Sequence, residues 1–380
     1  MPDTFSTAEI KNRSIKGAKW LLIMNGIGML IGFLINLMLG RIGPAALGIY
    51  TLAQILISFI TTFLIYGGDS VLSVFLPKLP DAEDRGSFIF SYMLILFGVM
   101  TSVLSVLWLF PEWFEFFLRQ EFDMQNYGWF VLLAVVVVTT KTLVNTASGL
   151  MLIKTVAIAQ QMVHLVLLPL TVILFFFKPE MLVNYYALSL ILSGFVCGEI
   201  LAAIICMIGI SRERRFKMQL GWLLPPGFWA FSATTMMSVI FSFLYANIDR
   251  MAVYSIQDLE GLGIYQAILA VNTFIEMMPL LIRPSLIPAF SSLLGANHQG
   301  AFQKAFSLLS RWSVVPVTLV SLAVMAFSRE ILALFGPEYV EYAYLLVLFG
   351  LVAIIRSLNT CLLYTSPSPR DRTRSRMPSS

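Results

Sequence analysis

The chain is organised around the stretch Tyr245–Arg283, which begins YANIDRMAVY and continues after a polar turn, from Gly261, as GLGIYQAILAVNTFIEMMPLLIR. An apolar run ends here at the charged dipeptide Asp249-Arg250, and a second run begins after the turn. The stretch also contains Leu262-Gly263-Ile264-Tyr265, which repeats Leu47-Gly48-Ile49-Tyr50 at an offset of 215 positions. The pattern predicts two apolar helices joined by a turn, in a chain that contains an internal repeat.

Composition extends this reading to the whole chain. Of the 380 residues, 58% are hydrophobic and 12% are charged, whereas soluble domains carry about 25% charged residues. The apolar residues form runs of about twenty, long enough to cross the roughly 30 Å hydrocarbon core of a bilayer as helices. We predict an all-α polytopic membrane protein with about ten spans: 17–40, 46–66, 87–109, 128–151, 155–177, 182–210, 227–248, 262–282, 306–327 and 343–360.

The positive charges predict the orientation of these spans. Lys and Arg are concentrated in segments that lie on the same side as the N-terminus if the spans alternate, including the basic loop 211–226. Cytoplasmic loops carry such an excess, so we expect the N-terminus to be cytoplasmic. Because the basic residues lie in short loops and not in one patch, the net charge of +4 gives no indication of nucleic-acid binding, and a membrane topology explains these residues better. We expect contact with membrane lipids and no nucleic-acid partner.

Two further matches support the repeat. Gly86-Ser87-Phe88 corresponds to Gly300-Ala301-Phe302, and Asn126-Tyr127 corresponds to Glu341-Tyr342, each at the start of an apolar run. Six spans separate the copies, so both enter the membrane from the same side and form parallel repeats. We therefore predict two six-helix lobes, with the first over 1–210, a cytoplasmic inter-lobe loop over 211–226, and an incomplete second lobe of four helices over 227–360.

The composition of the C-terminal segment differs abruptly from that of the apolar run before it. From Cys361 it reads CLLYTSPSPRD and ends RMPSS, which resembles the translation of sequencing-library adapters. We expect residues 361–380 to be an artefact that truncates the natural protein near Thr360, after about ten of its transmembrane helices.

Nothing in the sequence resembles a catalytic site. The two histidines, His164 and His298, are far apart, the three cysteines have no zinc-site spacing, and no phosphate-binding GxxxxGK[ST] loop occurs. We expect no enzyme and no cofactor. Work across the membrane would then come from an ion gradient, with protons or sodium as the ion, from the substrate gradient or from a partner.

Ionisable groups inside spans usually face protein or water, which marks them as candidate functional residues. Asn272 and Glu276 are four residues apart and share a helix face. Glu276 either lines a cavity, where it would bind a proton, a cation or a sugar, or is paired with a Lys or an amide on a neighbouring helix. Asp249-Arg250 is either part of a functional mouth or a solvated helix end.

Three short motifs together resemble a known family. Asn247-Ile248-Asp249-Arg250 followed by Gly261–Tyr265, Arg41–Pro44 followed by Leu47–Tyr50, and Ile331–Tyr339 with its FGPEY sequence are similar to passages of polysaccharide-export (Wzx-type) flippases. That family belongs to the multidrug/oligosaccharidyl-lipid/polysaccharide transporter superfamily. The resemblance covers essentially residues 10–360.

The resemblance implies two six-helix lobes around a central cavity lined by spans one, two, seven and eight. It implies translocation of a lipid-linked, pyrophosphate-bearing oligosaccharide, for which Arg or Lys would be suitable ligands. Glu276 would be the ion-coupling candidate. The expected substrate- or cavity-lining residues are Asn25, Arg41, Asp69, Asn247, Asp249, Arg250, Asn272, Glu276 and Arg283.

We therefore predict a flippase for lipid-linked oligosaccharides that works by alternating access in a bacterial or archaeal cytoplasmic membrane, with polysaccharide polymerases as candidate partners. The alternative is a multidrug or organic-cation exporter of the same superfamily, which would favour acidic and aromatic cavity walls. A membrane-embedded glycan polymerase or ligase would need a large external loop with catalytic Arg or His, and the longest one, about 110–127, is short and acidic.

Overall fold

The structure is a computed structural model that describes residues 7–67, 70–79, 81–110, 124–177, 181, 187–213, 219–295 and 314–363. Within these ranges the side chains of 7–16, 18, 124–127, 277–295 and 358–363 are not described. The packing of the helices divides the chain into two compact units, Met1–Gln266 and Ala267–Ser380. The predicted lobe boundary at 211–226 remains a prediction.

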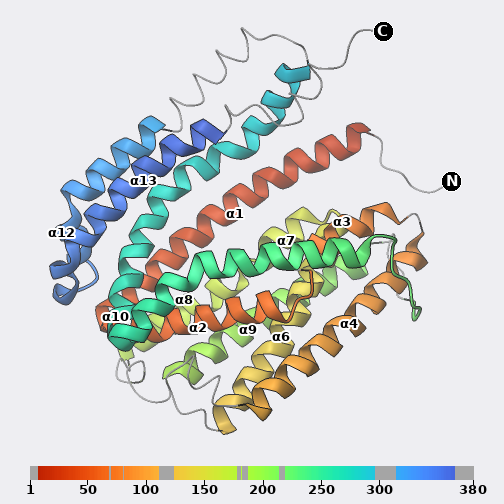
Figure 1. Cartoon of the computed structure of the whole chain (residues 1–380), viewed down its shortest axis with the longest axis horizontal. Helices are drawn as coiled ribbons and strands as arrows, with labels where there is room; N and C mark the ends of the chain where they lie inside the picture. The colour runs from red at the N-terminus through yellow and green to blue at the C-terminus, as the bar shows by residue number, and fades with distance from the viewer. Residues whose placement is uncertain are drawn as a thin grey trace. The chain divides into compact units, whose positions relative to one another are not determined.

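The described part of the chain is helical (Figure 1). Its elements are α1 (Thr7–Ile42), α2 (Pro44–Phe63), α3 (Val71–Phe75), η2 (Leu76–Lys78), α4 (Ala82–Leu109), α6 (Met124–Gly149), α7 (Ile153–Ala159), α8 (Met162–Phe177), α9 (Ala187–Ser211), α10 (Phe228–Gly295), an unlabelled helix Val314–Ala326, α12 (Ser328–Ala333), η4 (Pro337–Tyr342) and α13 (Ala343–Leu363).

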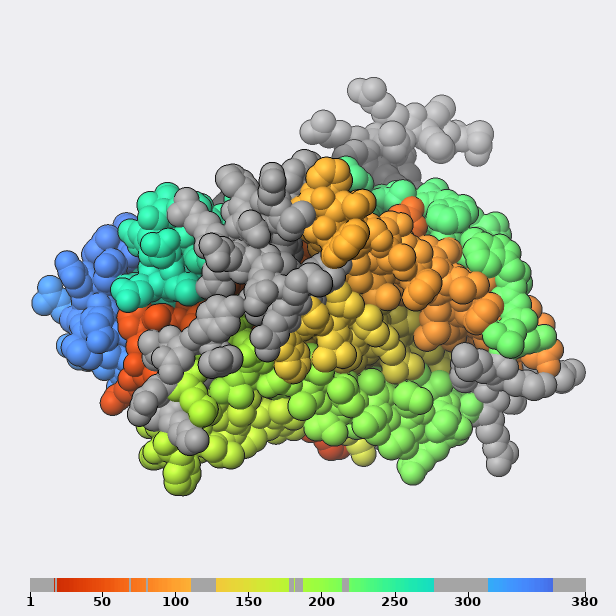
Figure 2. All heavy atoms as spheres, turned by 90° about the horizontal axis from the view of Figure 1, so that it is seen from below, coloured from red at the N-terminus to blue at the C-terminus, as the bar shows by residue number. Residues whose placement is uncertain are grey.

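In the first unit, α9 is the helix around which its neighbours pack. It lies against α6, α8, α7 and α2. The Tyr50 ring of α2 stacks on the Phe195 ring of α9 with centroids 6.0 Å apart, and the Thr140 hydroxyl of α6 donates to the carbonyl of Glu199 at 3.0 Å. On the outer surface α4 lies beside α6, as Figure 2 shows. Ile204 and Met207 of α9 are nevertheless exposed, so its apolar residues face both the neighbouring helices and the surface, as in a membrane span.

α10 contains two of the predicted spans. Asp258 has φ 59° and ψ −160°, which is not helical and turns the chain between the two arms. Phe228, at the start of the first arm, is buried among Phe75, Phe88 and Tyr92 of α3 and α4. This aromatic cluster packs the first arm of α10 with the N-terminal helices.

The second unit contains α10 from Ala267 onward, the helix Val314–Ala326 and α13. Ile275, Val317 and Ala353, one from each helix, are almost fully buried and form its core. Ser328 begins the short helix α12, which leads into η4.

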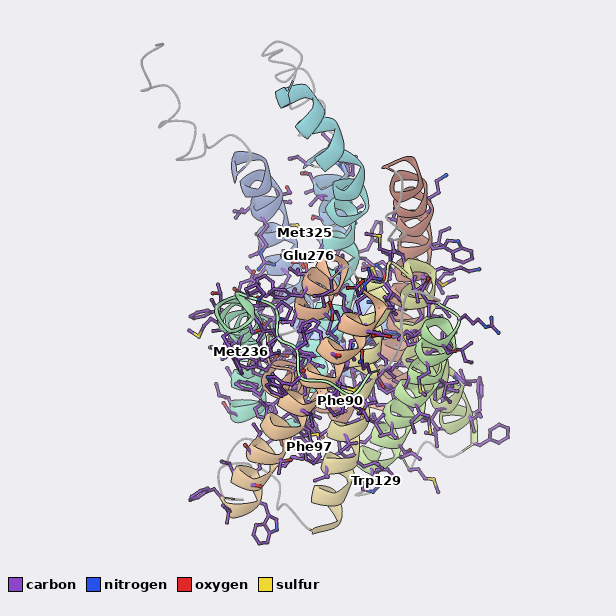
Figure 3. All side chains as sticks on the ribbon, turned by 90° about the vertical axis from the view of Figure 1, so that its right-hand side faces the viewer. Phe90, Phe97, Trp129, Met236, Glu276 and Met325 are labelled. Carbon is purple, nitrogen blue, oxygen red and sulfur yellow. The ribbon has the colours of Figure 1, made fainter. Side chains whose placement is uncertain are left out.

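Eight described segments are long and apolar enough to cross a membrane. One of them, Phe228–Glu276, has 49 residues, more than twice the roughly 20 that one crossing needs, and the turn at Asp258 divides it as predicted. Large apolar side chains on outer surfaces, such as Phe97 of α4 (Figure 3), are exposed, as lipid-facing residues are. The prediction of an all-α polytopic membrane protein is confirmed.

Two helices begin with the same Gly-Pro sequence in a similar backbone conformation. Gly43 before α2 and Gly336 before η4 have φ of 154° and 158°, and each is followed by proline at the first helical position. This backbone region is close to glycine-only, and proline fits the first turn because its missing N–H would have no helical partner there. The Gly-Pro pairs of two of the family-like motifs thus set the direction of the chain at helix starts.

The repeated LGIY segments meet at a reciprocal close contact. A Cβ atom at Gly48 would collide with the carbonyl oxygen of Leu259, and one at Gly263 would collide with the carbonyl oxygen of Pro44. At the repeat offset of 215, Leu259 is the counterpart of Pro44 and Gly263 is the counterpart of Gly48. In each contact the glycine of one copy therefore lies against the carbonyl of the equivalent residue in the other copy. This local two-fold relation supports the repeat inferred from sequence. The Gly300–Phe302 match lies outside the described residues.

We predict that Gly48→Ala and Gly263→Ala each destabilise the protein by about 1–3 kcal/mol, because the added methyl group overpacks backbone against backbone. Since both act on one crossing, the double variant should lose less than the sum of the two. The measurement is thermal unfolding in detergent. Gly98→Ala on α4, where a Cβ meets nothing within 4 Å, is the matched control, and losses no larger than its own would contradict the prediction.

Candidate functional site

Buried amides connect α10 to the N-terminal helices. Gln266 Nε2 donates to Asn36 Oδ1 of α1 at 3.1 Å, and Asn36 Nδ2 donates to the Gly32 carbonyl at 2.7 Å. Asn247 Nδ2 donates to the Ser58 hydroxyl of α2 at 3.3 Å and to the Phe243 carbonyl at 3.0 Å. The Gln266–Asn36 contact lies beside the LGIY crossing, near the α1–α2 turn, whereas Ser58 lies ten residues further along α2 than Gly48, toward the other end of that helix. We call Asn36, Gln266, Ser58 and Asn247 the amide clamp.

The two arms of α10 are joined by a second set of polar contacts. The Tyr265 hydroxyl donates to Asp249 Oδ2 at 2.7 Å, and the Arg250 backbone N–H donates to Asp249 Oδ1 at 2.8 Å. The buried Arg250 Nε has no hydrogen-bond partner among the described atoms. A half-buried guanidinium with an unused donor is a suitable ligand for an anion.

The predicted residues of α1 lie at two places along that helix. Asn25 is exposed, and its Oδ1 accepts from Gln161 Nε2 at 3.4 Å. Gln161 follows the break between α7 and α8, and Gly28 leaves room for its side chain. Arg41 is exposed in the last turn of α1.

In the second unit Asn272 and Glu276 share a partner from α13. Arg356 Nη1 lies 2.6 Å from Glu276 Oε1, and the two side chains are 50% and 43% exposed. Asn272 Nδ2 donates to the same oxygen at 3.3 Å. The sequence allows two alternatives for Glu276, a cavity-lining carboxylate or one paired with a Lys or an amide of a neighbouring helix. In the structure the carboxylate is paired, and its partner on the neighbouring helix is Arg356. Glu276 is labelled in Figure 3.

The structure thus groups Asn247, Asp249 and Arg250 in one place, and Asn272 with Glu276 in another. Asp69 lies outside the described residues, and so does the Arg283 side chain. Lining and coupling roles remain predictions. Among described residues no group of three His, Cys, Asp or Glu side chains could hold a metal.

Five residues of these groups were not among the predicted site residues: Asn36, Ser58, Tyr265, Gln266 and Arg356. Gln266 directly follows the second LGIY copy, so its position beside the crossing could have been inferred from the repeat. Arg356 is the only charged residue among the described side chains of α13, and an isolated charge in an apolar span is itself a signal of function.

Solved structures with the same fold are transporters. The structure matches one titled "Inward-facing conformation of a multidrug resistance MATE family transporter of the MOP superfamily" with a TM-score of 0.63 and 10% sequence identity, covering 87% of this chain and 81% of that one. It also matches "Crystal structure of MATE in complex with MaL6" with a TM-score of 0.54 and 12% identity, covering 92% and 85%. The chain therefore shares the fold of these two proteins.

The sequence itself identifies the family. Residues 14–294 match the family described as "Polysaccharide biosynthesis protein", and comparison with curated proteins gave no match. The chain belongs to this polysaccharide biosynthesis family, as its motifs suggested.

We predict that Asn36 and Gln266 are coupled energetically by about 0.6 kcal/mol, and at most about 1.7, as hydrogen bonds between membrane helices are. The test is a double-mutant cycle with Asn36→Leu and Gln266→Leu, measured by unfolding in a denaturing detergent. Thr101→Val is a matched control partner because its exposed hydroxyl bonds only within α4. Strict additivity of Asn36→Leu and Gln266→Leu would contradict the predicted coupling.

Proposed function

We propose that this protein translocates a lipid-linked oligosaccharide across a bacterial or archaeal cytoplasmic membrane for surface polysaccharide biosynthesis. The observation that carries the proposal is the polysaccharide-biosynthesis match over residues 14–294 in a chain with a transporter fold. The match includes both LGIY copies and both arms of α10. The lipid-linked glycan is the proposed substrate, and a polysaccharide polymerase would use the product.

The proposed mechanism is alternating access. With the N-terminus in the cytoplasm, the LGIY crossing and the Asn36–Gln266 contact of the amide clamp would lie toward the outer end of the first unit. Neutral hydrogen bonds of about 0.6 kcal/mol each close that end without a large cost of opening. The glycan would enter from the cytoplasmic side while its lipid tail stays in the bilayer.

The candidate residues also favour an anionic substrate. Arg250 and Arg356 are the cations of the two groups of polar contacts, and guanidinium groups bind phosphate oxygens in a fixed bidentate geometry. An exporter of organic cations is the alternative, supported by the titles of the structural matches. It would have to place a cation beside these arginines, which electrostatic repulsion disfavours.

The decisive test is reconstitution in proteoliposomes with a lipid-linked oligosaccharide, with external access of the glycan to a lectin as the readout. We expect protein-dependent appearance of the glycan on the opposite leaflet, and a several-fold slower rate for Arg250→Gln. Arg329→Gln, at an exposed arginine of α12, is the control. Efflux of a cationic dye without glycan movement would identify the exporter instead.

Ion coupling by Glu276 makes a separate prediction. If a proton acts at this carboxylate, Glu276→Gln should remove the dependence of glycan translocation on pH while the protein still folds. The measurement is the translocation rate in vesicles at several pH values. Glu330→Gln on α12, an exposed carboxylate of the same unit, serves as control. An unchanged rate and pH profile for Glu276→Gln would remove Glu276 from the coupling scheme.

A further inference from the structure

The Glu276–Arg356 pair lies among apolar helices. The helix Val314–Ala326, which packs against both α10 and α13, contains no charged residue. On α13 the other titratable side chain described is Tyr344, twelve residues away, and on α10 Arg283 follows Glu276 by seven residues, with a side chain that is not among those described. Ionised groups are costly in a membrane span, so each member of this pair depends on the other.

Asn272 contributes an unused acceptor to the same place. Its Nδ2 donates to Glu276 Oε1, while its Oδ1 is buried and has no hydrogen-bond partner among the described atoms. The residue is only 6% exposed, so water does not readily satisfy that oxygen. An unsatisfied buried acceptor carries a free-energy cost, which a new donor nearby would remove.

A protonated Glu276 would be such a donor. A carboxylate only accepts hydrogen bonds, whereas a carboxylic acid also donates one, and an amide presents a donor on one side and an acceptor on the other. Asn272 can therefore serve Glu276 in both protonation states, donating to the carboxylate or accepting from the acid. Arg356 has no such versatility, because a guanidinium only donates and stays charged.

We propose that Arg356, Glu276 and Asn272 form a proton-linked site for the phosphate groups of the lipid-linked substrate. A phosphate oxygen replaces Glu276 as the acceptor of the Arg356 N–H groups. Glu276 takes up a proton from water and donates it as a hydrogen bond to Asn272 Oδ1. The site rests on the proposed function for the identity of the substrate, but its chemistry is that of any phosphate or pyrophosphate group.

Electrostatics requires the proton and the phosphate to bind together. Two anions beside one guanidinium repel each other, and neutralising the carboxyl group removes that repulsion. By reciprocity, phosphate binding favours protonation as much as protonation favours phosphate. Glu276 must release its proton when the phosphate leaves, so the proton and the substrate bind and dissociate together. Such a site makes substrate binding dependent on pH, but it does not by itself couple inward proton flow to export.

The test is direct binding to the full chain in nanodiscs, measured by calorimetry across pH with inorganic pyrophosphate, a polyprenyl pyrophosphate and phosphatidylglycerol as separate probes. Wild type should bind pyrophosphate more tightly as the pH falls, with proton uptake visible as a dependence of the heat on the buffer. Glu276→Gln imitates the protonated state, so its affinity at neutral pH should rise by about fivefold, the upper range for a solvent-reachable pair, and lose its pH dependence.

Matched variants separate this site from general effects. Arg356→Gln should abolish the pH-dependent binding, Arg356→Lys should weaken it with the fold kept, and Arg329→Gln should bind as wild type does. Asn272→Leu should reduce proton uptake on binding, because the acceptor for the protonated carboxyl group is lost.

The opposite results overturn the proposal. Unchanged pyrophosphate affinity and pH dependence in Glu276→Gln, or wild-type binding by a folded Arg356→Lys and Arg356→Gln, would exclude the site. Equal binding of phosphatidylglycerol, with no preference for the polyprenyl pyrophosphate, would exclude the substrate assignment. Proton-linked pyrophosphate binding without glycan translocation in vesicles would instead exclude the proposed function and leave the site standing.

Discussion

The close crossing at Gly48 and Gly263 is the constraint on which the arrangement of the first unit depends. Membrane helices gain little from the hydrophobic effect on association, so close packing and polar contacts decide which surfaces meet. Here each glycine lies against a backbone carbonyl of the other copy, where no side chain fits. The crossing fixes the register of α2 against α10, and this register brings Gln266 to Asn36 and Asn247 to Ser58.

Much of the fold could be predicted because the sequence features that determine it are local. Apolar runs of membrane length, the LGIY repeat and the Gly-Pro helix starts are local features, and each has a local physical cause. The turn at Asp258 followed from the polar segment between two apolar runs, although its unusual backbone angles did not. The contacts of Phe228 with α3 and α4 place the first arm of α10 in the first unit, and no repeat pattern predicts them.

The candidate site was less predictable because its contacts join distant parts of the chain. Asn272 and Glu276 were found by their spacing, but Arg356 lies 80 residues beyond Glu276, and helix spacing carries no information about a partner on another helix. The same holds for Asn25, which bonds to Gln161 across 136 residues. Sequence could name the polar residues that need partners, and only the packing of the helices could pair them.

The two sets of polar contacts differ in a way that suits different tasks. The amide clamp is built from neutral groups, whose bonds in a membrane are weak individually and do not respond to pH or to a charged ligand. The Glu276–Arg356 pair is half exposed and ionic, and its arginine can bind a carboxylate or a phosphate with similar geometry. The neutral contacts would therefore be insensitive to a charged ligand, while the charged pair would be sensitive to an anion under the proposed mechanism. In the proposed mechanism, this difference in chemistry is what would allow substrate recognition and gating to be distinct steps.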